Sequence, residues 1–127
     1  MHGVFCGCKQ FNQAIGEWDT SSVTSIVRMF EEASSFNADI GKWSVAKVTI
    51  MRKTFLIPAA YTRASYSYTP TASAFDTDLG KWSVAKVIDM HSMFEGASNF
   101  NSDVSTWITN TVTSMYSMFK GATGTHD

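Results

Sequence analysis

Apolar residues recur along this chain with a period of 25 residues, interrupted once. Each of four segments opens with phenylalanine, and tryptophan follows seven residues later, valine twelve, isoleucine or methionine fifteen, and a second phenylalanine nineteen. These phases hold Phe11, Phe36, Phe75 and Phe100; Trp18, Trp43, Trp82 and Trp107; Val23, Val48, Val87 and Val112; Ile26, Met51, Met90 and Met115; and Phe30, Phe55, Phe94 and Phe119. Self-similarity at such a period is typical of repeat proteins, in which each unit buries its apolar face against its neighbours.

The period divides the chain into one partial and four longer units within a single repeat array, 1–127. The interval from Phe36 to Phe75 is 39 residues, so one unit carries 14 extra residues, and the register places them within 56–71. The units are a partial repeat, 1–10, and repeats 11–35, 36–74, 75–99 and 100–124. Because both ends interrupt a unit, we expect a piece of a longer array that frays or self-associates end to end.

Each unit is expected to contain a short strand followed by a short helix. The Phe-Asn-x-x-Ile segment is bounded by turn residues, which predicts a brief extended segment. Apolar residues spaced by three and four in the second half predict a helix or helical turn: Val112, Met115, Met118, Phe119 and Ala122. The predicted fold is therefore an α/β repeat solenoid of about four coils, each with a short strand and a short helix or helical turn.

One pattern, nearly complete from Phe75 to Ala97, resembles a known repeat family. Phe-Asn-x-Asp-Ile-Gly-x-Trp-x-Val-x-x-Val-Thr-x-Met-x-x-Met-Phe-x-x-Ala is similar to the BspA-like repeat of bacterial and protist surface proteins, a leucine-rich-repeat type. The resemblance implies a leucine-rich-repeat-like stack, commonly part of a surface protein or adhesin that binds host or matrix proteins. It implies a cell-surface or extracellular location and no enzymatic activity.

Composition narrows the classes of partner. Ten Lys plus Arg against eleven Asp plus Glu give a net charge of −1, so no basic surface indicates a nucleic-acid partner. Apolar stretches are far shorter than the roughly 20 residues that span a bilayer, which argues against direct membrane insertion. The first ten residues lack the charged and apolar regions of a signal peptide.

The insertion is the first candidate for contact with a partner protein. It contains both prolines and three of the four tyrosines, so its composition differs from the repeat and predicts a loop. We take Tyr61, Arg63, Tyr66 and Tyr68 as candidate partner-binding residues. A loop without any partner and a misread stretch of the gene are the alternatives.

Two columns of lysines form a second candidate surface. The segments from Ile40 and from Leu79 are nearly identical and place lysines at matching phases. Lys42 and Lys81 form one column and Lys47 and Lys86 the other, and both could receive an acidic partner. Solvated lysines that prevent edge pairing are the favoured alternative.

No group of residues indicates catalysis, a cofactor or a metal. The histidines are scattered, and Cys8 occupies a phase that holds alanine in three other units, which predicts a small packed side chain. Two polar columns are interpreted as hydrogen-bonding scaffold: Asn12, Asn37, Asp76 and Asn101, and Asp39, Asp78 and Asp103. The sequence favours a non-enzymatic interaction module, and the alternative is a structural spacer array with no ligand of its own.

Overall fold

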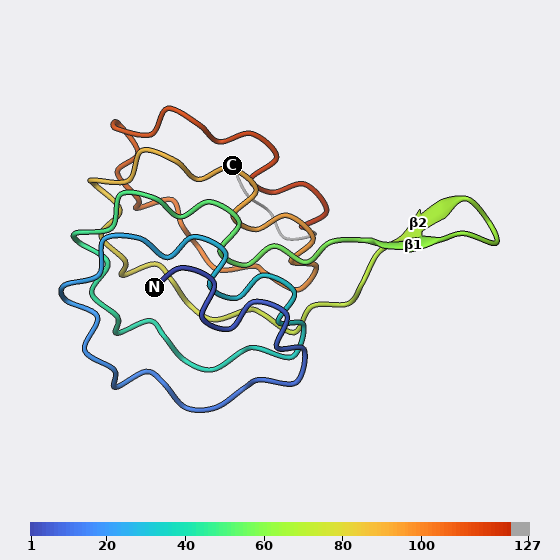
Figure 1. Cartoon of the computed structure of the whole chain (residues 1–127). Helices are drawn as coiled ribbons and strands as arrows, with labels where there is room; N and C mark the ends of the chain where they lie inside the picture. Colours follow the sequence, from blue (N-terminus) through green and yellow to red (C-terminus); the bar gives the residue numbers. More distant parts are fainter. Residues whose placement is uncertain (123–127) are drawn as a thin grey trace.

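Backbone hydrogen bonds between successive repeats hold the chain in a stack of coils. The computed structural model describes residues 1–122, and its coils lie one above another from blue in the lower part of Figure 1 to red at the top. The N–H groups of Ile26, Arg28, Phe30 and Glu32 donate to carbonyls of the following coil at 2.8–3.2 Å. The same pattern continues from residues 51–57 to 89–95 and from 90–96 to 114–120. We call these inter-coil bonds the backbone ladder.

The backbone ladder has a consistent polarity. Each of its peptide units points its N–H toward the following coil and its C=O toward the preceding one, as in the unit between Ser25 and Ile26. Intervening N–H groups instead close turns within a coil, such as Met29 to the carbonyl of Ile26. Parallel bridges mark one register position of the ladder in every coil: Ser25 with Ile50, Ile50 with Asp89, and Asp89 with Ser114.

The helix predicted for the second half of each unit is wrong. The described residues contain no helix, and this half forms consecutive turns. One column has positive φ in every coil, which ends any right-handed helix there: Gly3, Arg28, Lys53, Ser92 and Ser117 at 53° to 61°. Side chains spaced by three and four still face inward in the middle coils, but alternate N–H groups, such as those of Phe30 and Glu32, donate to the following coil rather than to a preceding turn of their own coil.

The strand predicted for the first half of each unit is also wrong. No strand forms at residues 36–40 or at the matching positions of the other described units. Side chains join the coils here: Asn37 N–H donates to Asn12 Oδ1, and Asp76 N–H to Asn37 Oδ1, each at 2.7 Å. Because the Asn and Asp side chains supply the acceptors, adjacent backbones need no direct pairing. The α/β solenoid of helices and strands is therefore replaced by a stack of turns.

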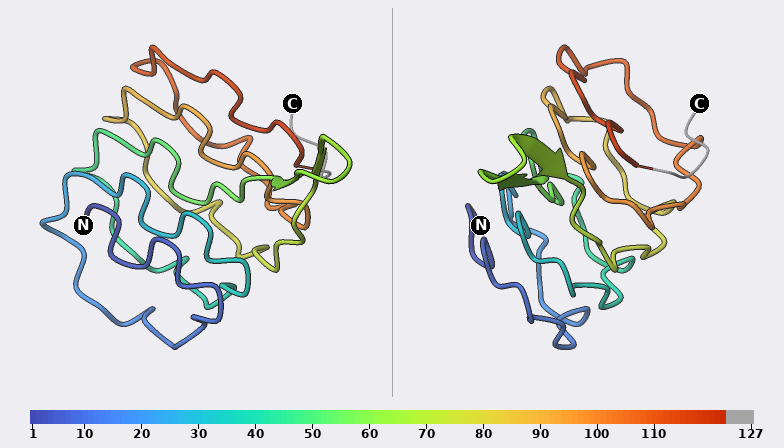
Figure 2. Two further views of the ribbon diagram at one scale, coloured as in Figure 1. Left: turned by 45° about the vertical axis from the view of Figure 1, so that its right-hand side comes forward. Right: turned by 90° about the vertical axis from the view of Figure 1, so that its right-hand side faces the viewer.

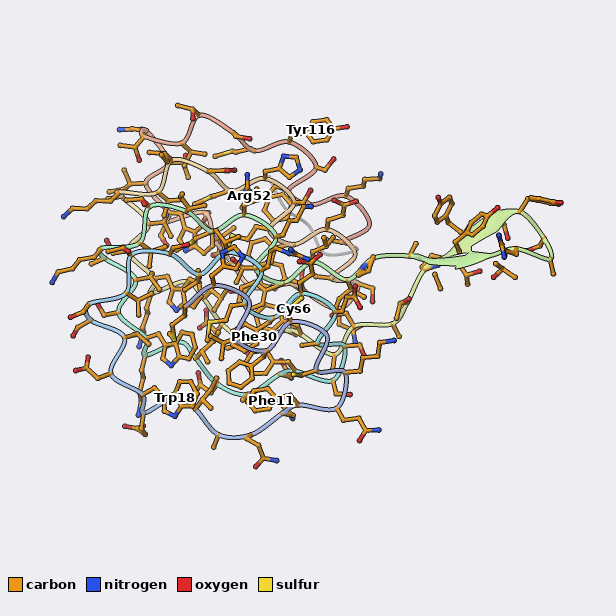
Figure 3. All side chains as sticks on the ribbon, viewed as in Figure 1. Cys6, Phe11, Trp18, Phe30, Arg52 and Tyr116 are labelled. Carbon is orange, nitrogen blue, oxygen red and sulfur yellow. The ribbon has the colours of Figure 1, made fainter. Side chains whose placement is uncertain are left out.

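Two columns of phenylalanine rings fill the centre of the stack. Phe30, Phe55 and Phe94 follow one another at centroid distances of 5.6 Å with nearly parallel planes. Within a coil, Phe30 stacks on Phe36 at 3.9 Å and Phe94 on Phe100 at 4.0 Å. Figure 3 shows Phe30 among the interior side chains. The predicted inward direction of the phenylalanine phases is confirmed, because these rings are buried in the middle coils.

The tryptophans pack against one side of the same core. Trp43, Trp82 and Trp107 are buried, and the ring of Trp82 lies 6.3 Å from Phe55. Each indole Nε1–H donates to the preceding coil at 3.0 Å: Trp43 to Ile15, Trp82 to Ile40, and Trp107 to Leu79. These bonds satisfy the one polar group that each indole brings into the core.

One glycine column allows neighbouring coils to approach closely. A Cβ on Gly41 would lie 2.8 Å from the carbonyl oxygen of Asp78, and one on Gly80 would lie 3.0 Å from that of Asp103. The matching position of the last unit is Ser105, which no following coil approaches within the described residues. Glycine is therefore required where another coil packs against this position.

The only strands among residues 1–122 lie in the insertion. They are β1, Ala60–Thr62, and β2, Ser67–Thr69, which pair antiparallel as a two-stranded sheet. Leu56 and Ile57 remain buried, and their backbones stay in the ladder, so the extra residues are 58–71 rather than the wider range 56–71. We call residues 58–71 the Tyr hairpin. It projects away from the coils in Figure 1, and the turned views of Figure 2 also place it outside them.

Candidate functional site

The Tyr hairpin is held at both of its ends and nowhere between. Before it, Ile57 is buried and donates its N–H to the carbonyl of Glu95 at 2.9 Å. After it, Ser73 is buried and its N–H donates to Ser98 Oγ at 3.2 Å. All residues from 58 to 72 are exposed. The stack therefore fixes where the hairpin emerges and leaves its surface uncovered.

The pairing register gives the hairpin two different faces. Tyr61 lies opposite Tyr68, and their rings are 5.0 Å apart and tilted by 48°. Alternation along the strands places Ala60, Thr62, Ser67 and Thr69 on the other face. One face is thus aromatic, and the other carries small and hydroxyl side chains.

The turn between the strands adds a third tyrosine and one charge. Tyr66 is 85% exposed and has a φ of 50° at the end of the turn. Arg63 at its start is the only charged residue of the hairpin. The Ser65 and Ser67 hydroxyls are hydrogen-bonded to each other at 2.7 Å. Tyrosine provides large contact area at low entropic cost, and serine provides adaptable hydrogen bonds, as in many paratopes.

The structure brings the four insertion candidates together, but it does not bring the lysine columns to them. The four tryptophans share one phase of the repeat and form a column, and Lys42 and Lys81 each directly precede one of them. Figure 3 shows Trp18 of that column on the opposite side of the stack from the hairpin. All four lysines, including Lys47 and Lys86, are exposed, and Lys42 Nζ lies 3.4 Å from Glu17 Oε1. The hairpin and the column that holds Lys42 and Lys81 are therefore separate candidate surfaces.

The two polar columns form hydrogen bonds within the scaffold, as predicted. The Asn12 column links coils through backbone N–H groups, although its side chains are exposed. In the second column, Asp39 Oδ1 accepts from Gly41 N–H, and Asp78 and Asp103 accept in the same way, each at 2.9 Å. Among residues 1–122 no cluster of His, Cys, Asp or Glu is suited to hold a metal ion.

The cysteines and histidines do not form a reactive constellation in the described part of the chain. Cys6 and Cys8 are free and exposed, so the packed side chain predicted for Cys8 is wrong, since no earlier coil covers it there. Burial of part of its surface, with a smaller effect of Glu31, raises the pKa of the Cys6 thiol and disfavours the reactive thiolate. His91 packs its ring against Tyr116 at 5.3 Å, and His126 lies outside the described residues.

A shallow hollow lies on the first two coils, away from these groups. Its volume is about 410 Å³, and its lining includes Asn12, Glu17, Asp39 and Lys42. The hollow is open to solvent, whereas sites for small ligands are clefts or cavities that bury most of the ligand. We also find no helix among residues 1–122 with the length and apolarity to cross a bilayer.

The backbone ladder presents a varied surface that sequence analysis did not select. One of its columns runs Val27, which is buried, then Arg52, His91 and Tyr116, and a neighbouring column runs Ser25, Ile50, Asp89 and Ser114. Arg52 and Asp89 from the two columns approach to 3.9 Å. Figure 3 shows Tyr116 at the outer surface of the last coil. The signal was present in the sequence as phases whose residue type changes from unit to unit.

The sequence of the hairpin also contains a pattern that predicts its strands and that the sequence analysis did not use. Aromatic and hydroxyl residues alternate along Tyr66-Ser67-Tyr68-Thr69, as in a strand, and Tyr61-Thr62 begins a matching run five residues before Tyr66. This alternation predicts a hairpin where the proline and tyrosine content alone indicated only a loop.

Comparison with known proteins gives a family without an assigned activity. The family described as Mycoplasma protein of unknown function, DUF285, matches the chain twice, at residues 1–69 and 62–126. No curated protein and no solved structure matches it. Two family matches that together extend over nearly the whole sequence agree with an internally repeated array. The chain belongs to the DUF285 family.

Proposed function

We propose that this chain is a non-enzymatic repeat module that binds another protein through the Tyr hairpin. The observation that carries the proposal is the exposure of Tyr61, Tyr66 and Tyr68 on one projecting element, at 50%, 85% and 72%. The repeat units outside the hairpin contain a single tyrosine, Tyr116. The aromatic side chains of the hairpin therefore lie outside the hydrophobic core, where they do not contribute to packing of the stack.

The energetics of the hairpin favour a partner. Two strands of three residues have too little pairing and burial to be stable on their own in water. Burying apolar surface contributes about 25 cal/mol per Å², so a partner that covers the tyrosine rings would both gain affinity and order the strands. The stack supports this binding by fixing both ends of the hairpin.

The resemblance to BspA-like surface proteins, to which the DUF285 family is related, suggests the setting of this interaction. In that setting the module is part of a larger surface-associated protein, and its partner is a host, matrix or cell-surface protein. Adhesion is then the biological role, with the coils acting as a scaffold and the hairpin as the contact element.

A structural spacer is the competing function. A spacer does not require varied side chains on its surface, whereas one ladder column changes from Arg52 to His91 to Tyr116 in successive coils. This variation favours binding and offers a second contact surface. End-to-end association of two copies is a separate proposal for the ends of the stack, where Trp18 and Met115 are 46% and 44% exposed.

Deletion of residues 58–71 tests the function directly, because it joins Ile57 to Ala72 and restores the 25-residue spacing. Immobilised intact chain, the deletion variant and a variant with Tyr61, Tyr66 and Tyr68 changed to serine would be exposed to purified matrix proteins. We expect one of these proteins to bind the intact chain with micromolar or better affinity and to bind both variants at least tenfold more weakly, a loss of about 1.4 kcal/mol. Equal binding to all three chains would contradict the assignment of the hairpin, and binding to none would support the spacer.

A further inference from the structure

The Tyr hairpin has a second property, which concerns a covalent modification rather than a contact. Arg63 stands at the start of its turn, Ala64 follows, and both are exposed. From this arrangement we infer that the Arg63–Ala64 peptide bond is a processing site for proteases that cleave after basic residues. The cut chain stays assembled as two pieces, 1–63 and 64–127.

Accessibility distinguishes Arg63 from the other nine Lys and Arg residues. A protease requires several residues on both sides of the scissile bond in an extended form, so buried neighbours prevent cleavage. At six of the other basic positions the next residue is buried and its N–H is hydrogen-bonded within the coil: Met29, Trp43, Val48, Thr54, Trp82 and Val87. Cleavage at those positions requires a coil to unfold.

The remaining three basic residues are also tied into the stack. Arg52 is followed by Lys53, whose N–H donates to the carbonyl of His91 at 2.9 Å. The carbonyl of Lys9 accepts from Ser35 N–H, and that of Lys120 accepts from Gly96 N–H. Each of these scissile peptides therefore contributes a group to an inter-coil bond.

The hairpin can open without disturbing those bonds. Its own pairing extends over only three residues in each strand, and no side chain between 58 and 72 is buried. Opening such a segment costs little free energy, and proteolysis follows the population of the open form. Fourteen extended residues reach roughly 45 Å, which is long enough to pass through a protease cleft while Ile57 and Ser73 remain in place.

The chemistry of the step is simple hydrolysis. Water adds across the Arg63–Ala64 amide, so that Arg63 gains a carboxylate and Ala64 a free amine, with no oxidant or cofactor. Ala64 is a small residue, and neither Pro58 nor Pro70 adjoins the bond, so the sequence does not block a trypsin-type enzyme.

The stack itself holds the two pieces together after the cut. Met51, Lys53, Phe55 and Ile57 in the first piece donate N–H groups to Asp89, His91, Met93 and Glu95 in the second. The ring of Phe55 lies between Phe75 at 4.0 Å and Phe94 at 5.6 Å, which both belong to the second piece. Because the pieces share a continuous core, the cut removes chain connectivity without removing the packing.

Cleavage separates the two arms of the hairpin and thereby removes its binding surface. Tyr61 remains on the first piece, and Tyr66 and Tyr68 go to the second, so the pair 5.0 Å apart is no longer tied by a turn. This consequence rests on the proposed function, whereas the processing site and the stability of the cut stack do not. Proteolysis would then switch off adhesion while the scaffold survives.

Limited digestion of the full chain with trypsin tests the processing site. Mass spectrometry should show the first cut after Arg63, at least about tenfold faster than cuts after any other Lys or Arg. Arg63→Gln should slow this first cut to the rate of the other sites, and Arg63→Lys, which keeps the cationic side chain, should still be cut. A first cut inside a coil, or an unchanged rate in Arg63→Gln, would overturn the assignment.

Size-exclusion chromatography of the cut protein tests the second part. The two pieces should co-elute at the volume of the intact chain and separate only in denaturant, and separation in native buffer would overturn the two-piece assembly. Binding of the partner identified by the deletion experiment should fall at least tenfold after cleavage, and undiminished binding would refute the switch. If the intact chain binds nothing, the proposed function fails together with the switch, while the digestion data still decide the processing site.

Discussion

The stack and the Tyr hairpin use aromatic side chains in opposite ways. Phe55 in the stack is 2% exposed and packs between rings of neighbouring coils, whereas Tyr66 in the hairpin is 85% exposed and has no coil beside it. Both belong to the same unit of the repeat, 36–74. Aromatic composition therefore does not reveal the role of a residue, but its position relative to the 25-residue period does.

The two regions also differ in what holds their backbone. In the stack, the backbone ladder joins residues that are far apart in sequence and lie beside a continuous core. In the hairpin, the bonds join residues at most nine apart and all are exposed to water. The free energy of unfolding should therefore depend strongly on substitutions in the stack, which is the covered region, and weakly on substitutions in the hairpin, which is the uncovered region.

The largest expected difference comes from removing one ring in each region. Phe55→Ala leaves a cavity between Phe30, Phe75 and Phe94, and we expect the free energy of unfolding to fall by about 3–5 kcal/mol. Tyr66→Ala removes an exposed ring and should change it by less than about 0.5 kcal/mol. Urea unfolding of both variants measures the contrast, and similar losses would contradict the division into covered and uncovered regions.

A smaller effect should separate backbone strain from close packing. Gly96 has a φ of 75°, and an added Cβ would lie against the carbonyl oxygen of Ile57. Gly7 has the same phase and a φ of 78°, but open space surrounds it. We expect Gly7→Ala to cost about 1–2 kcal/mol from strain alone, and Gly96→Ala to cost more because the preceding coil, which holds Ile57, must shift. Thermal or urea unfolding of the pair decides this, and equal losses would show that close approach is unimportant.

A third contrast tests the indole hydrogen bond. Trp82→Phe keeps an aromatic ring but removes the donor to the carbonyl of Ile40, so we expect a loss of about 1 kcal/mol plus a contribution from the smaller ring. Trp18 is 46% exposed, and no preceding coil offers it a carbonyl among the described residues, so Trp18→Phe should have much less effect. The difference in the urea midpoint at constant slope measures the bond.

The smallest effect concerns acid pH. Hydrogen bonds from the hydroxyl and N–H of Ser105 lower the pKa of the Asp103 carboxyl. A lowered folded-state pKa contributes stability above the ordinary value of about 3.9, and that stability is lost as the pH falls through the lowered value. Asp103→Asn should therefore make the melting temperature less sensitive to pH below about 4. An unchanged acid response would show that this carboxylate does not contribute.

The repeat, its phases and the location of the extra residues followed from the sequence, but the local structure of the units did not. Spacing by three and four at Met115, Met118 and Phe119 fits a helix, and it equally fits consecutive turns. The difference lies in positive φ at Arg28, Lys53, Ser92 and Ser117, residue types that give no local sign of a left-handed conformation. Only the neighbouring coils, which bind the redirected N–H groups, stabilise those turns.

For the candidate site, the sequence selected the tyrosines that the hairpin brings together, but not their geometry. Proline and tyrosine content marked 56–71 as different, and the structure narrowed the range to 58–71, because Leu56 and Ile57 are still needed by the core. The register that places Tyr61 opposite Tyr68 depends on a four-residue turn. Lys42 and Lys81, selected by the same sequence reasoning, directly precede tryptophans at the phase of Trp18, which lies on the opposite side of the stack from the hairpin.

The sequence alone thus determined which residues recur, which of them are buried, and where the period is broken, because apolar periodicity reports directly on the burial of side chains. Tertiary structure alone decided how each coil bonds to the next, through backbone N–H groups on one side and Asn or Asp side chains on the other. The physical reason is that a backbone conformation with alternating turns is stable only when an adjacent coil accepts its outward hydrogen bonds, and the accepting carbonyls lie 24 or more residues away in the chain.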